Sequence, residues 1–327
     1  MSGCVLVTGG AGFIGSHAVE ALLAGGERVR VLDDFSTGKH ENLSSVSGAL
    51  ETGALEVVEG DVRAAGACAA ATRGCDRVLH LAAVASVTRS FDDPAETDAV
   101  NVGGTANVLT AAREAGVRRV AFASSCAIYG STDDLPAREG ARPHPESPYA
   151  ASKLRAEQLC REACRDGTLD VGVLRFFNVY GPRQDPSSEY SGVIAIFMDR
   201  VAAGRPCTVY GDGSQTRDFV YVADVVTACR AVLDGGRPDA GGARLAAAPV
   251  NVGTGLETSL LDVLAALAEA SGRRPAVEFA AARADDIGRS RAACERAADL
   301  LAFTSSTPFA EGLATTWAWY LAGTRSR

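Results

Sequence analysis

The sequence predicts an α/β fold built on a parallel sheet. Short apolar, β-branched runs alternate with helical patterns through the first half of the chain, and parallel strands need crossover connections of this length. The first run leads at once into a glycine-rich turn and then into a helix, which is the order of elements in a dinucleotide-binding unit. We therefore expect a doubly wound parallel sheet of the Rossmann type.

The first unit begins with a strand at residues 5–7 and continues with a helix from His17 to Leu23. The turn between them carries spaced glycines, namely Gly9 or Gly10, Gly12 and Gly15. Glycine turns the chain sharply and lets the backbone approach a pyrophosphate with no Cβ in the way. The pyrophosphate is expected on unpaired N–H groups at the positive end of the helix dipole. An ordinary glycine-rich turn is the alternative.

The second strand, at residues 28–32, ends at Asp33. Asp33 follows Gly15 at close to the spacing of about 20 residues at which a carboxylate accepts hydrogen bonds from the adenosine ribose. Asp33 and Asp34 would repel a 2′-phosphate, which favours NAD over NADP; a turn cap is the alternative for Asp33. The loop around the ribose is expected to continue through Phe35, Ser36, Thr37 and Gly38.

Three further strands are predicted at residues 55–58, 77–81 and 120–123. Asp61 follows the first of them and is a candidate partner for the adenine amino group. The second runs into the small residues 82–86, which let a cofactor lie close to the backbone. His80, between apolar residues, is expected to be a packed, hydrogen-bonded histidine rather than a catalytic one. A helix over 98–115 carries Asn101.

The last of these strands leads into Ser125, and another helix begins at Ser147 and Pro148. Serine is a favourable N-cap, and proline suits the first helical position. Tyr149 and Lys153 then lie one turn apart on the same helical face. After a complete nucleotide-binding half, this pair favours an enzyme over a binding protein.

Length and composition limit the partners. The chain has 327 residues and a net charge of −8, so we expect no nucleic-acid or anionic-membrane partner. No apolar run approaches the roughly 20 residues of a membrane span, and the first strand begins too early for a signal peptide, so a cytoplasmic protein is expected. The nine cysteines are expected to be reduced and mostly buried. Cys160 and Cys164 share a helical face without a surrounding ligand cluster, so no metal is predicted.

These motifs together point to one family. The shared residues are the glycine motif, Asp33, Asp61, Asn101, Ser125 and Tyr149-x-x-x-Lys153. On them the chain resembles the extended short-chain dehydrogenase/reductase superfamily and, within it, the NAD-dependent sugar-nucleotide epimerase/dehydratase family, most closely UDP-hexose 4-epimerases. The resemblance continues through segments 175–183, 210–213 and 216–219 and ends near 283–290.

The resemblance implies an NAD-binding Rossmann domain over residues 1–175 and a smaller C-terminal α/β lobe over residues 176–327, with short segments returning to the first domain. The lobe would hold a UDP-sugar, and a homodimer would form through helices near 100–115 and 148–165. The implied NAD-binding residues are Gly9, Gly12, Phe13, Ile14, Asp33, Asp34, Phe35, Ser36, Thr37, Gly38, Asp61, Val62, Leu81, Ala82, Ala83, Asn101, Tyr149, Lys153 and Phe177. The implied substrate-binding residues are Ser86, Ser125, Asn178, Val193, Val209, Tyr210, Arg217, Arg283, Asp286 and Ser290.

Within that substrate set, the resemblance assigns the diphosphate to Asn178, Arg217 and Arg283. Forked arginine donors suit this role because they hold phosphate oxygens bidentately; surface ion pairs are the alternative. Asp286 would lie near the uridine ribose, and residues 209–210 near the base. The residues alone do not choose uridine over thymidine or guanosine.

The implied catalytic residues are Ser125, Tyr149 and Lys153. Tyrosine has an ordinary pKa of about 10, so making it a base near pH 7 takes about 4 kcal/mol of phenolate stabilisation. One cation about 4 Å away supplies this much at an effective dielectric constant of about 20. Lys153 and the oxidised nicotinamide are both candidate cations, and Ser125 would relay or steady the proton.

Relatives in the family eliminate water or lose carbon dioxide after the same oxidation. Their strand-end motif carries an acidic residue, whereas Cys126 and Ala127 stand in those places here and supply no carboxylate. We therefore predict 4-epimerisation of a UDP-hexose. A nucleotide-sugar dehydratase or UDP-glucuronate decarboxylase is the first alternative, and a non-catalytic NAD-sensing regulator is the second. Ser290, at the gate to the sugar 2-substituent, leaves room for an N-acetyl group, and Arg89 or Arg183 would suit a uronate.

Overall fold

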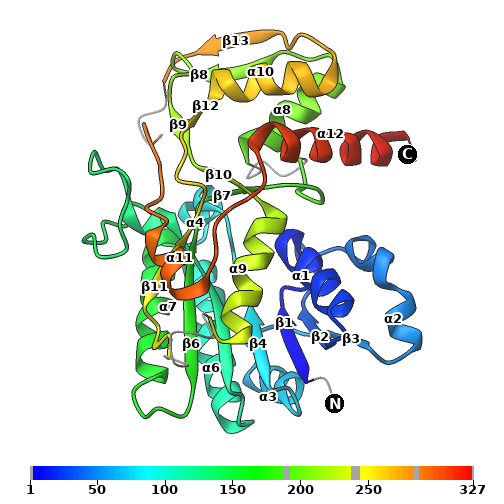
Figure 1. Cartoon of the computed structure of the whole chain (residues 1–327), viewed down its shortest axis with the longest axis vertical. Coiled ribbons are helices and arrows are strands. Elements are labelled where there is room, and N and C mark those ends of the chain that lie inside the picture. Colours follow the sequence, from blue (N-terminus) through cyan, green and yellow to red (C-terminus); the bar gives the residue numbers. More distant parts are fainter. Residues whose placement is uncertain (1–2, 187–191, 237–243, 283–286, 326–327) are drawn as a thin grey trace.

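The central element of the computed structural model is a seven-stranded sheet in which the neighbouring strands are parallel (Figure 1). The structure describes residues 3–186, 192–236, 244–282 and 287–325. The strand order is β11-β6-β5-β4-β1-β2-β3. The strands are β1 (Cys4–Thr8), β2 (Arg28–Asp33), β3 (Leu55–Glu59), β4 (Arg77–His80), β5 (Arg119–Ser125), β6 (Asp170–Phe176) and β11 (Pro249–Val252). The predicted parallel α/β fold is confirmed.

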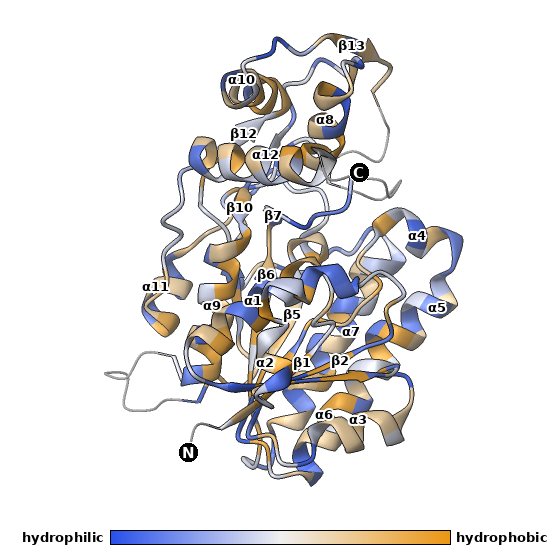
Figure 2. Ribbon diagram, turned by 90° about the vertical axis from the view of Figure 1, so that its right-hand side faces the viewer, coloured by the Kyte–Doolittle hydropathy of each residue, from blue (hydrophilic) through white to orange (hydrophobic). Residues whose placement is uncertain are grey.

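Helices cover both faces of the sheet because each presents one apolar stripe to it. Figure 2 shows α9 and α11 on one side and α3, α6 and α7 on the other. The helices of the first side are α1 (Phe13–Ala24), α9 (Val222–Asp234) and α11 (Glu295–Leu301), with η1 (His40–Val46) and α2 (Gly48–Glu51) beside them. Those of the second side are α3 (Ala65–Thr72), α6 (Thr105–Glu114) and α7 (Pro148–Ala163).

The order of the sheet reverses between β1 and β4. From β1 the chain proceeds to β2 and β3 on one side, and from β4 to β5 and β6 on the other. Loops that leave β1 and β4 therefore diverge, and a crevice opens at the carboxyl ends of these strands. The predicted glycine turn follows β1, and the predicted run of small residues follows β4.

The C-terminal part of the chain forms a smaller lobe with its own apolar core (Figure 1). Helices α8, α10 and α12 enclose this core, together with short two-stranded ladders. These elements are β7 (Asn178–Tyr180), α8 (Val193–Ala202), β8 (Cys207–Tyr210), β9 (Thr216–Arg217), β10 (Phe219–Tyr221), β12 (Thr258–Ser259), α10 (Leu260–Ser271), β13 (Val277–Ala280) and α12 (Phe309–Arg325). The lobe is not a continuous stretch of chain, because α9, β11 and α11 return to the large sheet.

One predicted helix is interrupted. The segment 98–115 is not a single α-helix, because α5 (Pro94–Asp98) is followed by a π-helical turn, η2 (Ala99–Gly104), before α6 begins. A π-turn shifts the direction of side chains within a helical run, and Asn101 lies inside it. Two short elements complete the fold, α4 (Val87–Asp92) and the 3-10 turn η3 (Cys126–Tyr129).

Candidate active site

The glycine turn after β1 forms a cradle for an anion. Gly9 has φ = +69°, in the left-handed region that favours glycine. A Cβ at Gly15 would lie 2.0 Å from the carbonyl oxygen of Gly9, so a side chain there would push α1 off the turn. Gly12 is the N-cap of α1 and offers no side-chain acceptor, which leaves the first N–H groups of the helix without intrahelical partners. A pyrophosphate fits this end of α1.

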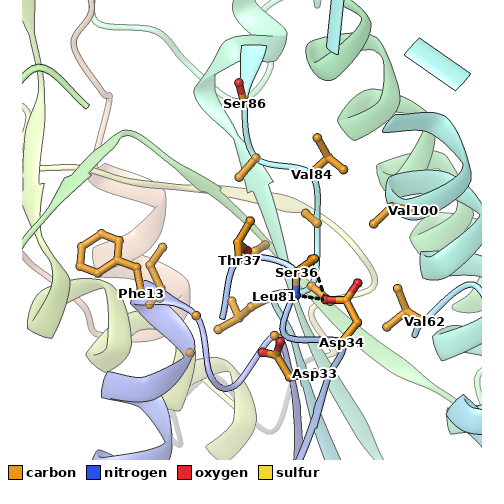
Figure 3. Close-up of a pocket in the computed structure, with 18 of the residues that line it drawn as sticks. Phe13, Asp33, Asp34, Ser36, Thr37, Val62, Leu81, Val84, Ser86 and Val100 are labelled. Carbon is orange, nitrogen blue, oxygen red and sulfur yellow. Dashed lines mark hydrogen bonds between the residues drawn. The ribbon is translucent and has the colours of Figure 1, made fainter. Parts of the chain in front are cut away.

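A cavity of about 540 Å³ opens beside the cradle. Figure 3 shows Asp33, Asp34, Ser36 and Thr37 along its wall, between Phe13 on one side and Val62 on the other. The predicted NAD-binding residues that line the cavity are Gly9, Gly12, Phe13, Ile14, Asp33, Asp34, Ser36, Thr37, Asp61, Val62, Leu81, Ala82, Ala83, Tyr149, Lys153 and Phe177. Its size lies within the range of ligand pockets, and its residues fit a dinucleotide.

Asp33 lies at the end of β2, next to the cradle. Its carboxylate accepts hydrogen bonds from the backbone N–H groups of Ala11 and Phe35, both at 2.9 Å, and burial raises its pKa. Phe35 and Gly38, also predicted to bind NAD, do not line the cavity. Phe35 stacks on His40 with ring centroids 3.9 Å apart, and a Cβ at Gly38 would lie 2.6 Å from Asp33 Oδ1. Their role in NAD binding stays a prediction.

Asp61 lies farther along the same wall and is already engaged by an arginine. Its oxygens accept hydrogen bonds from the backbone N–H and the Nε of Arg63, both at 2.7 Å, and these bonds lower the Asp61 pKa. Arg63 also pairs with Glu96 at 2.7 Å. Arg63 and Glu96 both line the cavity but were not predicted, since no spacing in the sequence indicates their contact.

Asn101 is buried and does not line the cavity, so its contact with NAD stays a prediction. Its amide bonds to both the N–H (2.8 Å) and the carbonyl (3.0 Å) of Val84 and donates to Ser152 Oγ at 3.0 Å. Asn101 thus fixes the loop after β4 against α7. The prediction for His80 is confirmed: it is buried, its ring nitrogens bond to threonine hydroxyls, and burial lowers its pKa to about 3.

The three predicted catalytic residues line one part of the cavity. Ser147 caps α7 by accepting from the N–H of Ala150 at 3.1 Å, which places Tyr149 in the first turn. Tyr149 hydrogen-bonds to Ser125 at the end of β5. The Lys153 ammonium lies 6.0 Å from the centre of the Tyr149 ring. It donates to the carbonyl of Ala123 at 2.9 Å, which fixes its position beside β5.

Burial acts on the ionisation of both Tyr149 and Lys153. It raises the pKa of Tyr149 to about 12, against the lowering effect of the Ser125 hydrogen bond. It also lowers the pKa of Lys153 to about 8. Bringing a phenol from about 12 to about 7 takes about 7 kcal/mol, so the 4 kcal/mol expected from the sequence is too small. The figure of about 4 kcal/mol does not include the cost of burying the phenolate. Lys153 alone therefore does not stabilise the phenolate enough for Tyr149 to act as a base at pH 7.

A buried polar network lies behind the catalytic helix and was not predicted. Glu157, one turn after Lys153, is fully buried and accepts from Arg175 Nε at 2.9 Å and Nη2 at 2.8 Å. Ser124 Oγ also donates to Glu157 at 2.6 Å. Arg175 Nη1 reaches the Tyr129 hydroxyl at 3.0 Å. The network ties α7 to β5 and β6 and so fixes the helix that carries Tyr149 and Lys153.

One buried aspartate, Asp218, organises the backbone near several of the predicted substrate residues. Asp218 is fully buried, and its carboxylate accepts from the N–H groups of Thr254 (2.7 Å), Gly255 (2.9 Å) and Ala292 (3.0 Å). The N–H of Asn178 donates to the Asp218 carbonyl at 3.0 Å. Asp218 was part of a recognised sequence segment without an assigned role, and it brings the segments of Asn178, Arg217 and Ser290 together.

The structure places the remaining predicted substrate residues in different surroundings. Ser86 lines the cavity, and Ser290 hydrogen-bonds to Cys126, beside Ser125. Val209 is fully buried in the core of the lobe, and Tyr210 beside it is half-buried. Their place near the base stays a prediction. Val193 begins α8, and Arg217 Nη1 donates to the carbonyls of Thr216 (2.8 Å) and Ile287 (2.5 Å). Arg283 and Asp286 lie outside the described residues.

Of the two arginines considered for a uronate, Arg89 lines the cavity and Arg183 does not. Arg183 pairs with Glu20 at 2.5 Å. The nine cysteines are buried or half-buried thiols. Over the described ranges, the structure places no three metal-ligating side chains together, and it contains no helix long and apolar enough to span a membrane.

Comparison with known proteins agrees with this geometry. The chain is 43% identical to a UDP-glucose 4-epimerase of Mycolicibacterium smegmatis over 314 residues, which cover 95% of this chain and 96% of that protein. A UDP-N-acetylglucosamine 4-epimerase of Methanobrevibacter ruminantium, solved with UDP-N-acetylmuramic acid, superposes with a TM-score of 0.91 at 31% identity, covering 98% of this chain and 99% of that one. A UDP-glucose 4-epimerase of Thermus thermophilus, solved with NAD, gives a TM-score of 0.86 at 39% identity, covering 97% of this chain and 99% of that one.

The profile of one family covers most of the chain. Residues 5–252 match the NAD dependent epimerase/dehydratase family. This span contains the glycine cradle, Asp33, Ser125, Tyr149 and Lys153. Because of this match, and because the chain is 43% identical to the Mycolicibacterium smegmatis protein, it belongs to the NAD dependent epimerase/dehydratase family.

Proposed function

We propose that the protein catalyses the NAD-dependent 4-epimerisation of a UDP-hexose through a 4-keto intermediate. One observation carries the proposal: Ser125, Tyr149 and Lys153 line the same cavity as the glycine cradle and Asp33. A proton-transfer group therefore lies beside a dinucleotide site. The similarity to UDP-sugar 4-epimerases supports the choice of reaction.

The cofactor would be held by the N–H groups at the start of α1 and by Asp33. When bound, NAD would supply a hydride acceptor for the hydrogen at carbon 4 of the sugar and would supply the same hydride for the return step. Tyr149 takes the proton from the carbon-4 hydroxyl, and Ser125 shares that proton through its hydrogen bond to the phenol. Lys153 holds positive charge near the phenolate.

The diphosphate and the hexose of the substrate must be held differently. Asn178 and Arg217 hold the diphosphate, while the hexose turns over between the two half-reactions. A firm hold on the diphosphate and a loose one on the sugar allow the hydrogen to leave one face and return to the other. Ser290 has a small side chain that would leave space for an N-acetyl group at the sugar, and Arg89 on the cavity wall would give a uronate a cationic partner.

The dehydratase and decarboxylase alternatives need a carboxylate beside Ser125. Cys126 occupies that place, and burial raises its pKa to about 12. A thiol that stays protonated at neutral pH is a poor substitute for an ionised acid. This residue favours epimerisation over elimination.

A homodimer is a separate part of the proposal, with α6 and α7 as the interface. Leu109 and Ala156 turn into the core and are not part of the outer faces of these helices. Leu154 and Leu159 are half-buried, between exposed charged side chains such as Arg155. Light scattering tests the dimer, and a monomer across the micromolar range would refute it. The cytoplasmic location stays a prediction.

Product analysis tests the proposed reaction. The protein is incubated separately with UDP-glucose, UDP-N-acetylglucosamine and UDP-glucuronate, and proton NMR reports the configuration at carbon 4. We expect inversion at carbon 4 for at least one of the three, with no change in mass. Loss of water or carbon dioxide would replace the proposal with one of the alternatives, and no product from any of them would refute the substrate class.

A further inference from the structure

A short segment after β7 reaches back to the cofactor-binding half of the chain. Residues 181–185 lie between β7 and α8 in the sequence, yet they contact α1 and the loop after β2. The three polar contacts are His17 Nε2 to the Pro182 carbonyl (2.9 Å), Arg183 Nη2 to Glu20 Oε1 (2.5 Å) and Lys39 Nζ to Asp185 Oδ2 (2.5 Å). We call residues 181–185 with these partners the clasp.

The clasp joins two walls of the cavity. Ser36 and Thr37, just before Lys39, line one wall, and Gln184 lines the cavity from within the clasp. Gln184 Nε2 donates to the carbonyl of Val179 at 3.3 Å, which ties it to β7. Lys39 and Asp185 do not themselves line the cavity, but each lies within two residues of one that does, Thr37 and Gln184 respectively.

The clasp is held in an uncommon conformation. Arg183 has φ = +69°, which side chains other than glycine adopt only when their surroundings fix them there. Its side chain is 15% exposed, and Glu20 is 29% exposed. Burial opposes the ionisation of Glu20, but hydrogen bonds from Arg183 and Ser45 outweigh it and lower the Glu20 pKa. The pair is therefore charged at neutral pH and partly shielded from salt.

The other two contacts differ in strength. Burial lowers the pKa of His17, so at neutral pH the ring donates to Pro182 as a neutral imidazole. Lys39 and Asp185 are 46% and 36% exposed, and an exposed ion pair contributes little by itself. Because all three contacts lie on five consecutive residues, each restrains the chain for the other two.

From this arrangement we infer that the clasp retains the bound dinucleotide by closing the edge of its cavity, so that cofactor release requires the clasp to open. The inference rests on the proposed function, because a 4-epimerase regenerates its cofactor in each turnover and gains nothing from exchanging it. It assigns Arg183 to cofactor retention instead of to a uronate.

The test measures how fast bound NAD leaves the protein. Wild-type protein is loaded with NAD and freed of excess, and an enzyme that destroys free NAD is added. The NAD still bound is then measured by chromatography over time. The double variant Glu20→Gln with Asp185→Asn breaks two ion pairs. Glu41→Gln is the control for the loss of a negative charge near Lys39, at an exposed position outside the clasp. Thermal melting checks that each variant is folded.

We expect the double variant to lose NAD at least tenfold faster than wild type and Glu41→Gln to match wild type. A charge swap, Lys39→Glu with Asp185→Lys, should release NAD more slowly than Asp185→Lys alone. If wild type holds NAD and the double variant releases it at the same rate, the clasp is refuted while the proposed function stands. If wild type binds no NAD at all, both are refuted.

Discussion

Replacing Lys153 by methionine should shift the pH at which the enzyme gains activity. The ammonium lies 6.0 Å from the centre of the Tyr149 ring, and at an effective dielectric constant of about 20 this distance corresponds to about 3 kcal/mol. Losing that much phenolate stabilisation raises the phenol pKa by about two units. At pH 7, turnover by Lys153→Met should fall about 100-fold and recover as the pH rises.

The assay is kcat against pH from 6 to 10 for wild type and Lys153→Met, both saturated with NAD. Tyr149→Phe is the control, because without the phenol the alkaline recovery should be absent. Bound NAD is measured in each variant, so that loss of cofactor is not mistaken for loss of the charge. If the activity of Lys153→Met rises with pH at the same midpoint as wild type, Lys153 does not stabilise the phenolate.

Lys153→Met lowers activity but should not lower the stability of the fold. The pKa of Lys153 falls from 10.5 to about 8 in the folded protein. Between these values the unfolded chain binds more protons, so the free energy of unfolding rises with pH through this window. At pH 7 the buried charge costs about 3 kcal/mol, offset in part by the hydrogen bond to Ala123. Lys153→Met should therefore unfold at no lower temperature than wild type, and a clear decrease would contradict the assigned burial.

The other perturbations concern the buried network, cofactor choice, acid stability and substrate size. Arg175→Met leaves Glu157 buried without its two-bond arginine partner, with only Ser124 and the more distant Arg161 nearby, and should lower the free energy of unfolding by about 3–5 kcal/mol. Adding Glu157→Gln should restore part of that free energy, and a urea titration that finds a loss of less than about 1 kcal/mol would refute the network. Asp33→Asn should raise the ratio of NADP to NAD affinity at least tenfold, about 1.4 kcal/mol, by calorimetry, and an unchanged ratio would contradict the repulsion of a 2′-phosphate. Burial lowers the pKa of His80 from 6.5 to about 3, so the free energy of unfolding decreases as the pH falls through this window. His80→Gln should lose less stability than wild type over the same pH range, and equal losses in thermal melts at acid pH would contradict the burial of a neutral His80. Ser290→Tyr should reduce turnover of UDP-N-acetylglucosamine more than that of UDP-glucose, and equal effects would remove Ser290 from the sugar pocket.

Features encoded locally could be predicted from the sequence. The strand, glycine turn and helix at the N-terminus occupy one short stretch, and a Cβ at Gly12 or Gly15 would meet the Gly9 carbonyl within it. Tyr149 and Lys153 are one helical turn apart, so their common face follows from helix geometry. Ser147 and Pro148 mark the start of that helix by their own chemistry.

Features that depend on long-range contacts could not be predicted. The pair between Arg63 and Glu96 and the pair between Glu157 and Arg175 form only when crossovers bring distant segments together. The hydrogen bonds of Asn101 to Val84 and Ser152 likewise join segments that are distant in the sequence. The phenol pKa also depends on tertiary burial, which spacing in the sequence does not reveal.

The central claim is that Tyr149 starts a reversible oxidation at carbon 4 of a UDP-hexose. Its most direct test is turnover of UDP-glucose in deuterated water, followed by NMR and mass spectrometry of the product. We predict a product with inverted carbon 4, unchanged carbon-bound hydrogen and the mass of the substrate, formed by wild type and absent with NAD-loaded Tyr149→Phe. Deuterium on carbon, loss of water, or undiminished turnover by Tyr149→Phe would contradict it.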